Sequence, residues 1–333
     1  MATNWREVQQ RLAFHEPVPD HSLDAQGIDQ EALFAELWSR PGTLVLPLQG
    51  DRVLVDADGR LALLSPGQLG DGAGADAALR LYLGRVETEE GIPDDGVLVA
   101  AAPDAESAGA PVIAVLVDEH EAEQITAGQW KPLRAMSAEL DARDVGLATR
   151  AVALANWHRS HPFSPTTGHA TRVTNGGWVR VDEVSGAELF PRTDPAVIIA
   201  VLDDEDRLLL ASNMAWDSRV YSLIAGFVDP GESLEQAVQR EVFEESGVQV
   251  SDPAYLASQP WPFPASLMLG FRAQLTGGVD STRPDGVEIR ETKWFTRAEL
   301  EAEVSAGTVI LPGKASIARA IIDTWLGEAL NTP

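Results

Sequence analysis

Short apolar runs separated by polar turns dominate the first part of the chain. Between residues 42 and 66 the runs TLVLPL, RVLV and RLALL are separated by Gly-Asp and Asp-Gly pairs, a pattern typical of strands joined by hairpins. A stretch rich in Gly, Asp and Ala follows at 70–77, and the run VIAVLV at 112–117 indicates a buried strand. The pattern therefore predicts a β-rich N-terminal domain over residues 1–130.

The pattern then changes to strong helix formers with repeated Leu and Ala over residues 131–160, which predicts one or two connecting helices that end near Pro162. Residues 161–192 are rich in Gly, Thr and Ser and have the size of a small two-hairpin insert. We expect a third core over residues 193–330.

Within this third core, periodicity predicts strands at 196–203, 207–211 and 267–275, the first two joined by an acidic turn. A final helix is expected at 314–326.

Composition narrows the classes of function. With 333 residues, we expect two or three domains, and the formal net charge of −26 disfavours a broad surface for binding nucleic acid. The absence of cysteine excludes disulfides, iron–sulfur clusters, thiolate zinc sites and cysteine nucleophiles. The first ten residues lack the apolar core of a signal peptide, and the longest apolar run, 196–202, is too short for a membrane span. These features predict a soluble cytoplasmic protein with no membrane partner.

The segment from Gly226 to Val248 has the most informative spacing. Gly226 is followed by Glu232 and then by the run REVFEESGV at 240–248. Pro230-Gly231 predicts a turn, Ser233 and Gln236 fit a capping box, and Gly247 stands where a helix ends with positive φ. We therefore expect a loop that leads into one helix.

On this helix Leu234, Val238, Glu241 and Glu245 lie on one stripe, with Glu244 beside it. An acidic run is usually a solvated face, but here the carboxylates continue the apolar stripe. Their repulsion favours a bound divalent cation, and oxygen ligands favour Mg²⁺ or Mn²⁺.

The spacing is that of the complete Nudix box, and the chain resembles the Nudix hydrolases. Such an enzyme hydrolyses a P–O–P bond. We expect Glu245 to be the general base and a metal ligand, Glu241 and Glu244 to complete the metal site, and Arg240 to orient a glutamate by a bidentate pair. Glu232 is expected to organise the loop.

A second motif follows the box. Its rigid prolines and flat aromatic faces suit a purine or nicotinamide ring, to which Gln259 and Ser266 would offer hydrogen bonds, although a structural loop or a polyproline ligand has the same pattern. The motif comprises Ser258, Gln259, Pro260, Trp261, Pro262, Phe263, Pro264, Ala265 and Ser266. In this position it resembles the SQPWPFPxS motif of NADH pyrophosphatases, the NudC family.

The resemblance runs from about Trp130 onward and implies a mixed-sheet α/β/α sandwich, preceded by a zinc ribbon and a degenerate Nudix-like N-terminal domain. It implies a homodimer that splits NAD(H) into NMN(H) and AMP, and some members also remove NAD caps from RNA 5′ ends. Glu288 and the carbonyl of Ala225 would be further metal ligands. Phe227 and Phe190 would flank a substrate ring and Ala318 would contact it, whereas the residues alone suggest that both phenylalanines are core aromatics.

The insert departs from the family. The four thiolate positions hold Ser164, Thr167, Asp182 and Ser185, so zinc is not expected. A substitute site made from His158, His161, His169 and Asp182 repeats no known ligand spacing. We predict a metal-free ribbon held by the packing of Trp178, Phe163 and Phe190.

Two alternatives to the NAD(H) diphosphatase remain open. One is a Nudix hydrolase for ADP-ribose or another nucleoside diphosphate derivative. The other is a nucleotide-sensing Nudix module without catalysis, whose expected mark is substitution in the box; the box is intact. Removal of NAD caps from RNA would need only local contacts, since lysine occurs at positions 131, 293 and 314 alone.

Overall fold

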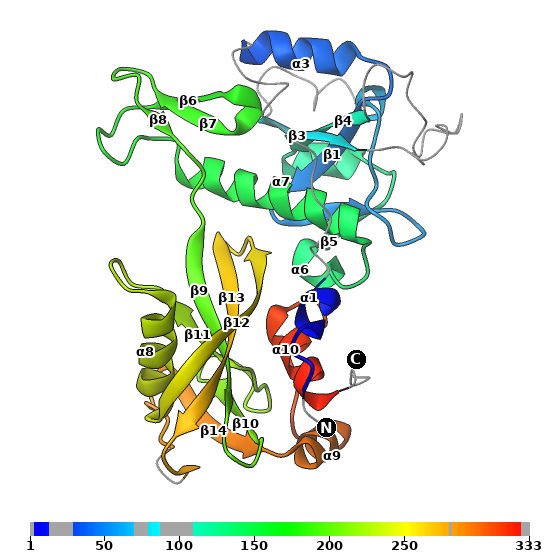
Figure 1. Cartoon of the computed structure of the whole chain (residues 1–333). Helices are drawn as coiled ribbons and strands as arrows, with labels where there is room; N and C mark the ends of the chain where they lie inside the picture. The colour runs from blue at the N-terminus through cyan, green and yellow to red at the C-terminus, as the bar shows by residue number, and fades with distance from the viewer. Residues whose placement is uncertain (1–2, 13–28, 70–78, 87–108, 280–281, 328–333) are drawn as a thin grey trace. The chain divides into compact units, whose positions relative to one another are not determined.

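The computed structural model describes residues 3–12, 29–69, 79–86, 109–279 and 282–327. The chain forms two compact units (Figure 1). The C-terminal unit comprises Met1–Ala13, Thr193–Trp261 and Ser266–Pro333, and the N-terminal unit comprises Phe14–Arg192 and Pro262–Ala265.

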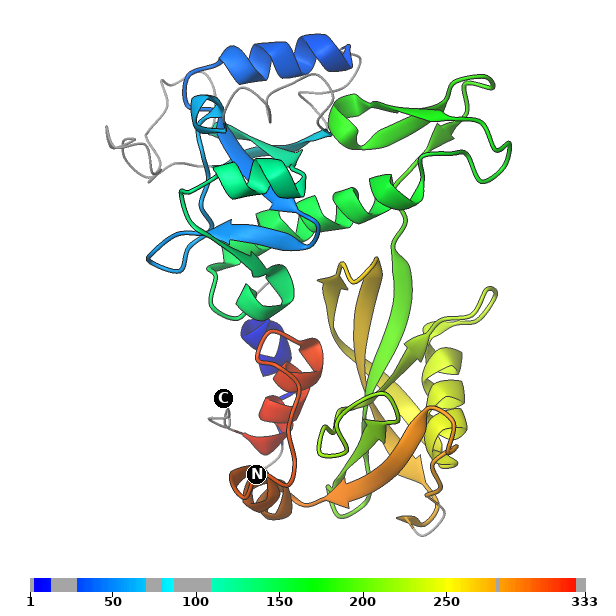
Figure 2. The same ribbon diagram turned by 180° about the vertical axis from the view of Figure 1, so that it is seen from behind.

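The first residues of the chain belong to the C-terminal unit, although we expected them in a domain at 1–130. Helix α1 (Glu7–Arg11) lies beside the last helix, α10 (Ile317–Leu326), as Figures 1 and 2 both show. Val8 and Leu12 enter the core that Ile321 also lines. Burial of these two side chains ties the N-terminal segment to the far end of the sequence.

A mixed sheet forms the centre of the C-terminal unit. Its order is β12-β13-β9-β10-β14, with β11 also paired to β9, and β13 runs parallel to β9 whereas β10 and β11 run antiparallel to it. The strands are β9 (Asp194–Leu202), β10 (Leu208–Asn213), β11 (Ile224–Phe227), β12 (Gln249–Trp261), β13 (Ser266–Thr276) and β14 (Ile289–Phe295).

Helices cover both faces of this sheet. Helix α8 (Leu234–Ser246) packs on one face and α10 packs on the other, with α9 (Arg297–Ser305) near the end of the chain. Along β9, Ile199 faces α8 whereas Ile198 faces α10, because successive strand residues point to opposite faces. The expected α/β/α sandwich with a mixed sheet is confirmed.

The N-terminal unit contains a second sheet, of order β3-β4-β1-β2-β5. Its elements are α3 (Gln30–Ser39), β1 (Leu44–Gln49), β2 (Arg52–Val55), η1 (Pro66–Gln68), β3 (Arg80–Val86), β4 (Ala110–Leu116), α5 (Glu119–Gln124), β5 (Gln129–Pro132), α6 (Leu133–Met136) and α7 (Ala142–Ser160). The expected β-rich domain is present, and the structure adds helices α3 and α5 over one face. The stretch expected as a loop at 70–77 lies outside the described residues.

The insert forms a small sheet of β6 (Thr171–Thr174), β7 (Val179–Asp182) and β8 (Glu188–Leu189), with a short helix η2 (Asn175–Gly177) between the first two strands. A fully buried carboxylate, Asp182, lies at its centre. Asp182 accepts hydrogen bonds from the backbone of Val184 and Ser185 at 2.9 Å and from the Thr167 hydroxyl. These bonds, that from Ser185 first, hold the pKa of Asp182 far below its usual range.

The prediction that Phe163 and Phe190 pack inside the ribbon is wrong, because these side chains are 60% and 63% exposed. Trp178 does pack against the N-terminal core and donates from Nε1 to the carbonyl of Tyr82 at 2.8 Å. The insert is therefore stabilised by the hydrogen bonds to Asp182 and by Trp178, and not by packing of Phe163 and Phe190.

His158 and His169, two histidines of the substitute site considered above, have hydrogen-bond partners on α7 and in the insert. His158 is buried on α7 and contacts the Gly177 carbonyl at 2.8 Å and Arg180 at 2.9 Å, whereas His169 contacts Asp182 at 3.3 Å. Among the described residues, no three His, Asp or Glu side chains are placed to hold a metal ion without rearrangement. Within the same residues, no helix combines the length and the apolar character that crossing a membrane requires.

Candidate active site

Helix α8 presents the residues of the box, and local sequence defines both of its ends. Ser233 and Gln236 form the expected capping box at its start. Gly247 ends the helix with φ 73°, and its N–H donates to Phe243. Val238 and Val242 are fully buried against the sheet, so the orientation of the helix is set by its apolar stripe.

Arg240 is the hub of the hydrogen bonds on this helix. Its guanidinium makes a bidentate pair with Glu232, with both N···O distances 2.8 Å. It also donates to Glu241 at 2.8 Å, to Glu244 at 3.0 Å and to the Phe227 carbonyl at 2.8 Å. These carboxylates, Glu232 first, raise the pKa of Arg240, and Arg240 lowers the pKa of Glu232.

Glu241 explains why the box begins with glycine. A Cβ atom added at Gly226 would lie 2.1–2.2 Å from the carboxylate atoms of Glu241. The carboxylate therefore lies directly over the backbone of β11, beside Ala225. Burial raises the pKa of Glu241, although its pair with Arg240 opposes this shift.

Glu245 is the most perturbed acid of the site. Burial is the main cause that raises the pKa of its carboxyl to about 8, and the nearby charges of Glu288, Glu241, Asp285 and Glu244 raise it further. Glu288 immediately precedes β14, so the sheet brings this residue to α8 from far along the chain.

The chemistry of these side chains suits a divalent cation, although no three of the described acids are already placed as its ligands. Glu241 and Glu245 are buried, Glu244 is exposed beside Arg240, and Glu288, just before β14, lies close enough for its charge to raise the pKa of Glu245. Carboxylate and carbonyl oxygens are the ligands that Mg²⁺ and Mn²⁺ prefer, and a cation would relieve the repulsion that raises the pKa of Glu245. The carbonyl of Ala225 lies on the neighbouring strand β11.

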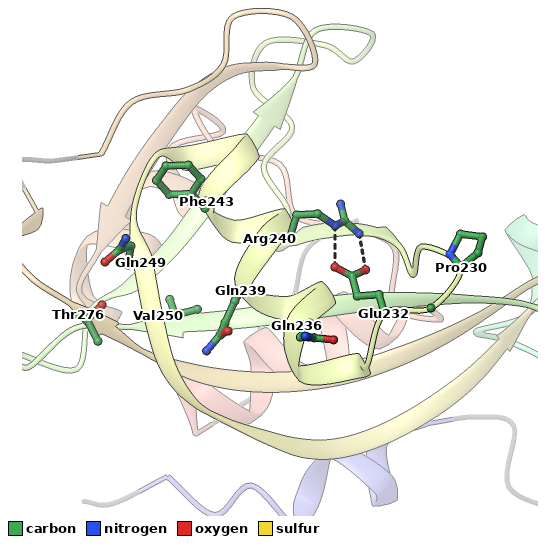
Figure 3. Close-up of a pocket in the computed structure, with 10 residues that line it drawn as sticks. Pro230, Glu232, Gln236, Gln239, Arg240, Phe243, Gln249, Val250 and Thr276 are labelled. Atoms are coloured by element: carbon green, nitrogen blue, oxygen red, sulfur yellow. Dashed lines mark hydrogen bonds and ion pairs between the residues drawn. The ribbon is translucent and has the colours of Figure 1, made fainter.

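A groove of about 800 Å³ runs along the outer side of α8 (Figure 3). Its lining contains neither Glu241 nor Glu245, and it reaches the box only through Glu232 and Arg240. The lining residues are Pro230, Gly231, Glu232, Gln236, Gln239, Arg240, Phe243, Gln249, Val250 and Thr276. The groove is therefore a feature separate from the buried carboxylates.

The proline-aromatic motif is divided between the two units. Ser258 to Trp261 end β12 and Ser266 begins β13, whereas Pro262–Ala265 belongs to the N-terminal unit. There the Asn156 amide donates to the carbonyls of Pro262 at 2.7 Å and Pro264 at 3.3 Å, and Phe263 packs against the N-terminal core. These contacts agree with the structural loop that the pattern left open as an alternative.

Gln259 also differs from its expected role. Its side chain is fully buried, and both polar atoms are occupied: Nε2 donates to Ala315 and Oε1 accepts from Ile317, each at 2.7 Å. We expected this amide to be offered to a substrate ring, but it joins β12 to the start of α10. Ala318 is buried on the same helix.

The two phenylalanines that the resemblance singles out, Phe227 and Phe190, are exposed, so the alternative reading as core aromatics is wrong. Phe227 ends β11 directly after Gly226. Sequence reasoning missed Asp285 and Asn213, which contact Glu288. Asn213 carries no local signal, since strand pairing brings it to Glu288, whereas Asp285 accepts from the Glu288 N–H only three residues along the chain.

Comparison with known families agrees with this geometry. The pattern described as NUDIX domain matches residues 192–311, and the pattern described as NADH pyrophosphatase-like rudimentary NUDIX domain matches residues 42–157. The second match covers the sheet of the N-terminal unit and most of α7.

Curated relatives match over most of the chain. Proteins named NAD-capped RNA hydrolase NudC from Mycobacterium bovis (strain BCG / Pasteur 1173P2) and Mycobacterium tuberculosis (strain ATCC 25618 / H37Rv) are each 40% identical, over 89% of this chain and 89% of theirs. The protein of that name from Stutzerimonas stutzeri is 37% identical over 63% of this chain and 72% of its own. With its intact box and these relatives, the chain belongs to the NudC family of Nudix hydrolases.

Proposed function

We propose that the protein hydrolyses the diphosphate bond of NAD(H) to NMN(H) and AMP and depends on Mg²⁺ or Mn²⁺. The observation that carries the proposal is the grouping of Glu241, Glu245 and Glu288 next to Gly226 in a chain of this family. Glu241, Glu244, Glu245, Glu288 and the Ala225 carbonyl would hold the cation. When bound, the cation supplies positive charge that offsets the diphosphate and acidifies water.

The residues of the chain then have distinct roles. Arg240 holds Glu241 and Glu244 and ties both to the loop through Glu232. Glu245 accepts a proton from the attacking water at a carboxylate oxygen. A Glu245→Gln variant keeps the shape but loses this acceptor charge, so we expect NADH turnover to fall by about a thousandfold or more.

The variant is measured for turnover and, by calorimetry, for AMP binding, with Glu235→Gln in the first turn of the same helix as the control. Loss of turnover with AMP binding retained is the expected pattern. Turnover near that of the unmodified protein would overturn the assignment of Glu245.

The substrate is tested by resolving products. The protein is incubated with NADH and Mn²⁺, and NMNH and AMP are separated; ADP-ribose is assayed under matched conditions. A preference for ADP-ribose would favour the alternative substrate, and binding without turnover of either compound would favour a nucleotide sensor. We further propose that the protein is a homodimer, which sedimentation of the purified chain tests. We also propose that it lies in the cytoplasm, which fractionation of the cells that produce it tests.

Removal of NAD caps from RNA is the second candidate activity. The names of the relatives at 40% identity favour it. Rates on NAD and on an NAD-capped oligonucleotide, measured side by side, decide whether the capped RNA is a substrate in its own right.

A further inference from the structure

A loop that the box does not include is hydrogen-bonded to the backbone of Glu288. Residues 214–219 join β10 to the segment before β11. The Met214 N–H donates to the Glu288 carbonyl at 2.8 Å, and the Asn213 amide lies 3.4 Å from the Glu288 carboxylate. The Ala215 N–H in turn donates to the Asn213 side chain at 2.8 Å. The loop and Glu288 therefore form one hydrogen-bonded assembly.

Arg290 holds this loop from the neighbouring strand. Its guanidinium donates to the Ser212 hydroxyl at 3.2 Å, to the Met214 carbonyl at 2.9 Å and to the Trp216 carbonyl at 3.2 Å. A β-bulge supports this: Ser212 pairs with Glu291 and Asn213 pairs with Ile289, so Arg290 is the extra residue. Bulges next to functional sites turn a side chain in a new direction.

The loop presents apolar surface to solvent beside charged groups. Met214 is 49% exposed and Trp216 is 44% exposed. The hydrogen bonds from Arg290 fix the backbone of both residues, so the two exposed side chains are held in place beside the site. A flat aromatic face and a thioether are well suited to a planar heterocycle.

The position of this surface suggests its ligand. The carbonyl of the exposed Phe227 accepts from Arg240, which also donates to Glu241 and Glu244. The Trp216 N–H donates to the carbonyl of Asn213, whose side-chain amide contacts the Glu288 carboxylate. A dinucleotide has one heterocycle on each side of its diphosphate. Two aromatic faces that are linked to different members of the carboxylate group match this arrangement.

We propose that Trp216 and Met214 take one heterocycle of the dinucleotide substrate and that Arg290 is the positioning residue for this loop and for Glu288. The proposal rests on the proposed function. It adds a substrate contact outside both sequence motifs.

Kinetics on NADH tests the contact. Trp216→Ala should raise KM about tenfold with kcat within about twofold, since stacking on an aromatic side chain contributes at this level, and Trp216→Phe should retain most of the affinity. Arg219→Ala is the matched control, because Arg219 lies in the same loop but its side chain pairs with Asp217. An unchanged KM in Trp216→Ala would overturn the contact.

Calorimetry with AMP and with NMN shows which ring is bound and does not require turnover. Trp216→Ala should weaken the binding of one mononucleotide about tenfold and spare the other. Equal binding of both by the variant and the unmodified protein contradicts the proposal, even if the unmodified protein fails to split NADH. The failure of the proposed function is thus distinguishable from that of the contact.

The positioning role has its own readout. Arg290→Lys keeps the charge but replaces a planar fork with a single ammonium group, so the loop and Glu288 lose their common support. Arg290→Ala and Arg290→Lys should both raise the Mg²⁺ concentration needed for half-maximal activity, by about tenfold, as disturbed outer-shell contacts do. Full activity of Arg290→Lys at the original Mg²⁺ concentration would refute positioning by the fork.

Discussion

Single residues determine whether the carboxylates of α8 can reach their place. Gly226 has an ordinary backbone conformation, so its role is to leave room: the Glu241 carboxylate lies where a side chain would start. Glu241 in turn is held by Arg240. The glycine and the arginine of the box therefore act on the same carboxylate from two sides.

A Gly226→Ala variant tests this fit. The added methyl would displace Glu241, so we expect NADH hydrolysis to fall by about a hundredfold or more, because small displacements of a catalytic group carry penalties of this size. Steady-state kinetics measures the loss and circular dichroism checks the fold. Gly313→Ala is the control, since a Cβ at Gly313 has open space around it. Hydrolysis unaffected by Gly226→Ala would contradict the steric role.

At the scale of elements, α7 is joined to the insert by a neutral histidine. His158 contacts the Gly177 carbonyl through Nε2 and Arg180 through Nδ1, so the imidazole donates at Nε2 and accepts at Nδ1. Burial, together with Arg180 and His161, lowers the pKa of His158 to about 4. Protonation would place a hydrogen on the atom that faces the Arg180 guanidinium.

This histidine should make the protein sensitive to mild acid. Above pH 6.5 the imidazole of His158 is neutral in both the folded and the unfolded chain. Between pH 6.5 and about 4 it binds a proton in the unfolded chain but not in the folded one. The free energy of unfolding therefore falls as pH decreases over this range. The loss amounts to about 3 kcal/mol. Urea unfolding across this range, compared between the unmodified chain and His158→Gln, measures it. His120→Gln, which changes an exposed residue of α5, should retain the dependence of the free energy of unfolding on pH. If His158→Gln showed the same dependence as the unmodified chain, His158 would be excluded as its source.

The insert should be stable without metal. Because Asp182 joins Thr167, Val184 and Ser185, Asp182→Asn replaces an acceptor-only carboxylate with an amide and should lower the melting temperature. Elemental analysis of protein purified without added ions checks the metal content. Stoichiometric zinc would disprove a metal-free insert. Glu183→Gln, at the next position, is the control.

At the scale of the whole molecule, charge limits how RNA can be bound. The net charge of −26 repels a polyanion over most of the surface. If the protein removes NAD caps, contacts with the RNA body should be few. The value of kcat/KM for cap removal should then change by about twofold at most between short and long capped RNA. It should change by about tenfold at most between 50 and 200 mM salt.

The rates of hydrolysis of capped RNA and of free NAD are measured over the same salt series. Free NAD has no RNA body, so its rate shows how salt affects the active site alone. A rate on RNA that rises steeply with length, or falls about a thousandfold with salt, would instead indicate an extended binding track.

The sequence by itself determined the features that depend on neighbours a few positions apart. The ends of α8, the stripe that joins Val238 to Glu241 and Glu245, and the alternating faces of β9 follow from helix and strand periodicity. The spacing of the box likewise identified the family, and the lack of cysteine excluded thiolate zinc.

Only the tertiary structure decided the contacts between distant segments. It placed Glu241 over Gly226, brought Ser212 and Arg290 together across β10 and β14, and buried Gln259 against the start of α10. It also left Phe163 and Phe190 exposed in the insert, where Asp182 accepts hydrogen bonds from the backbone. Periodicity reports which face a residue occupies, whereas strand pairing and packing, which depend on the whole chain, select the residue that it meets.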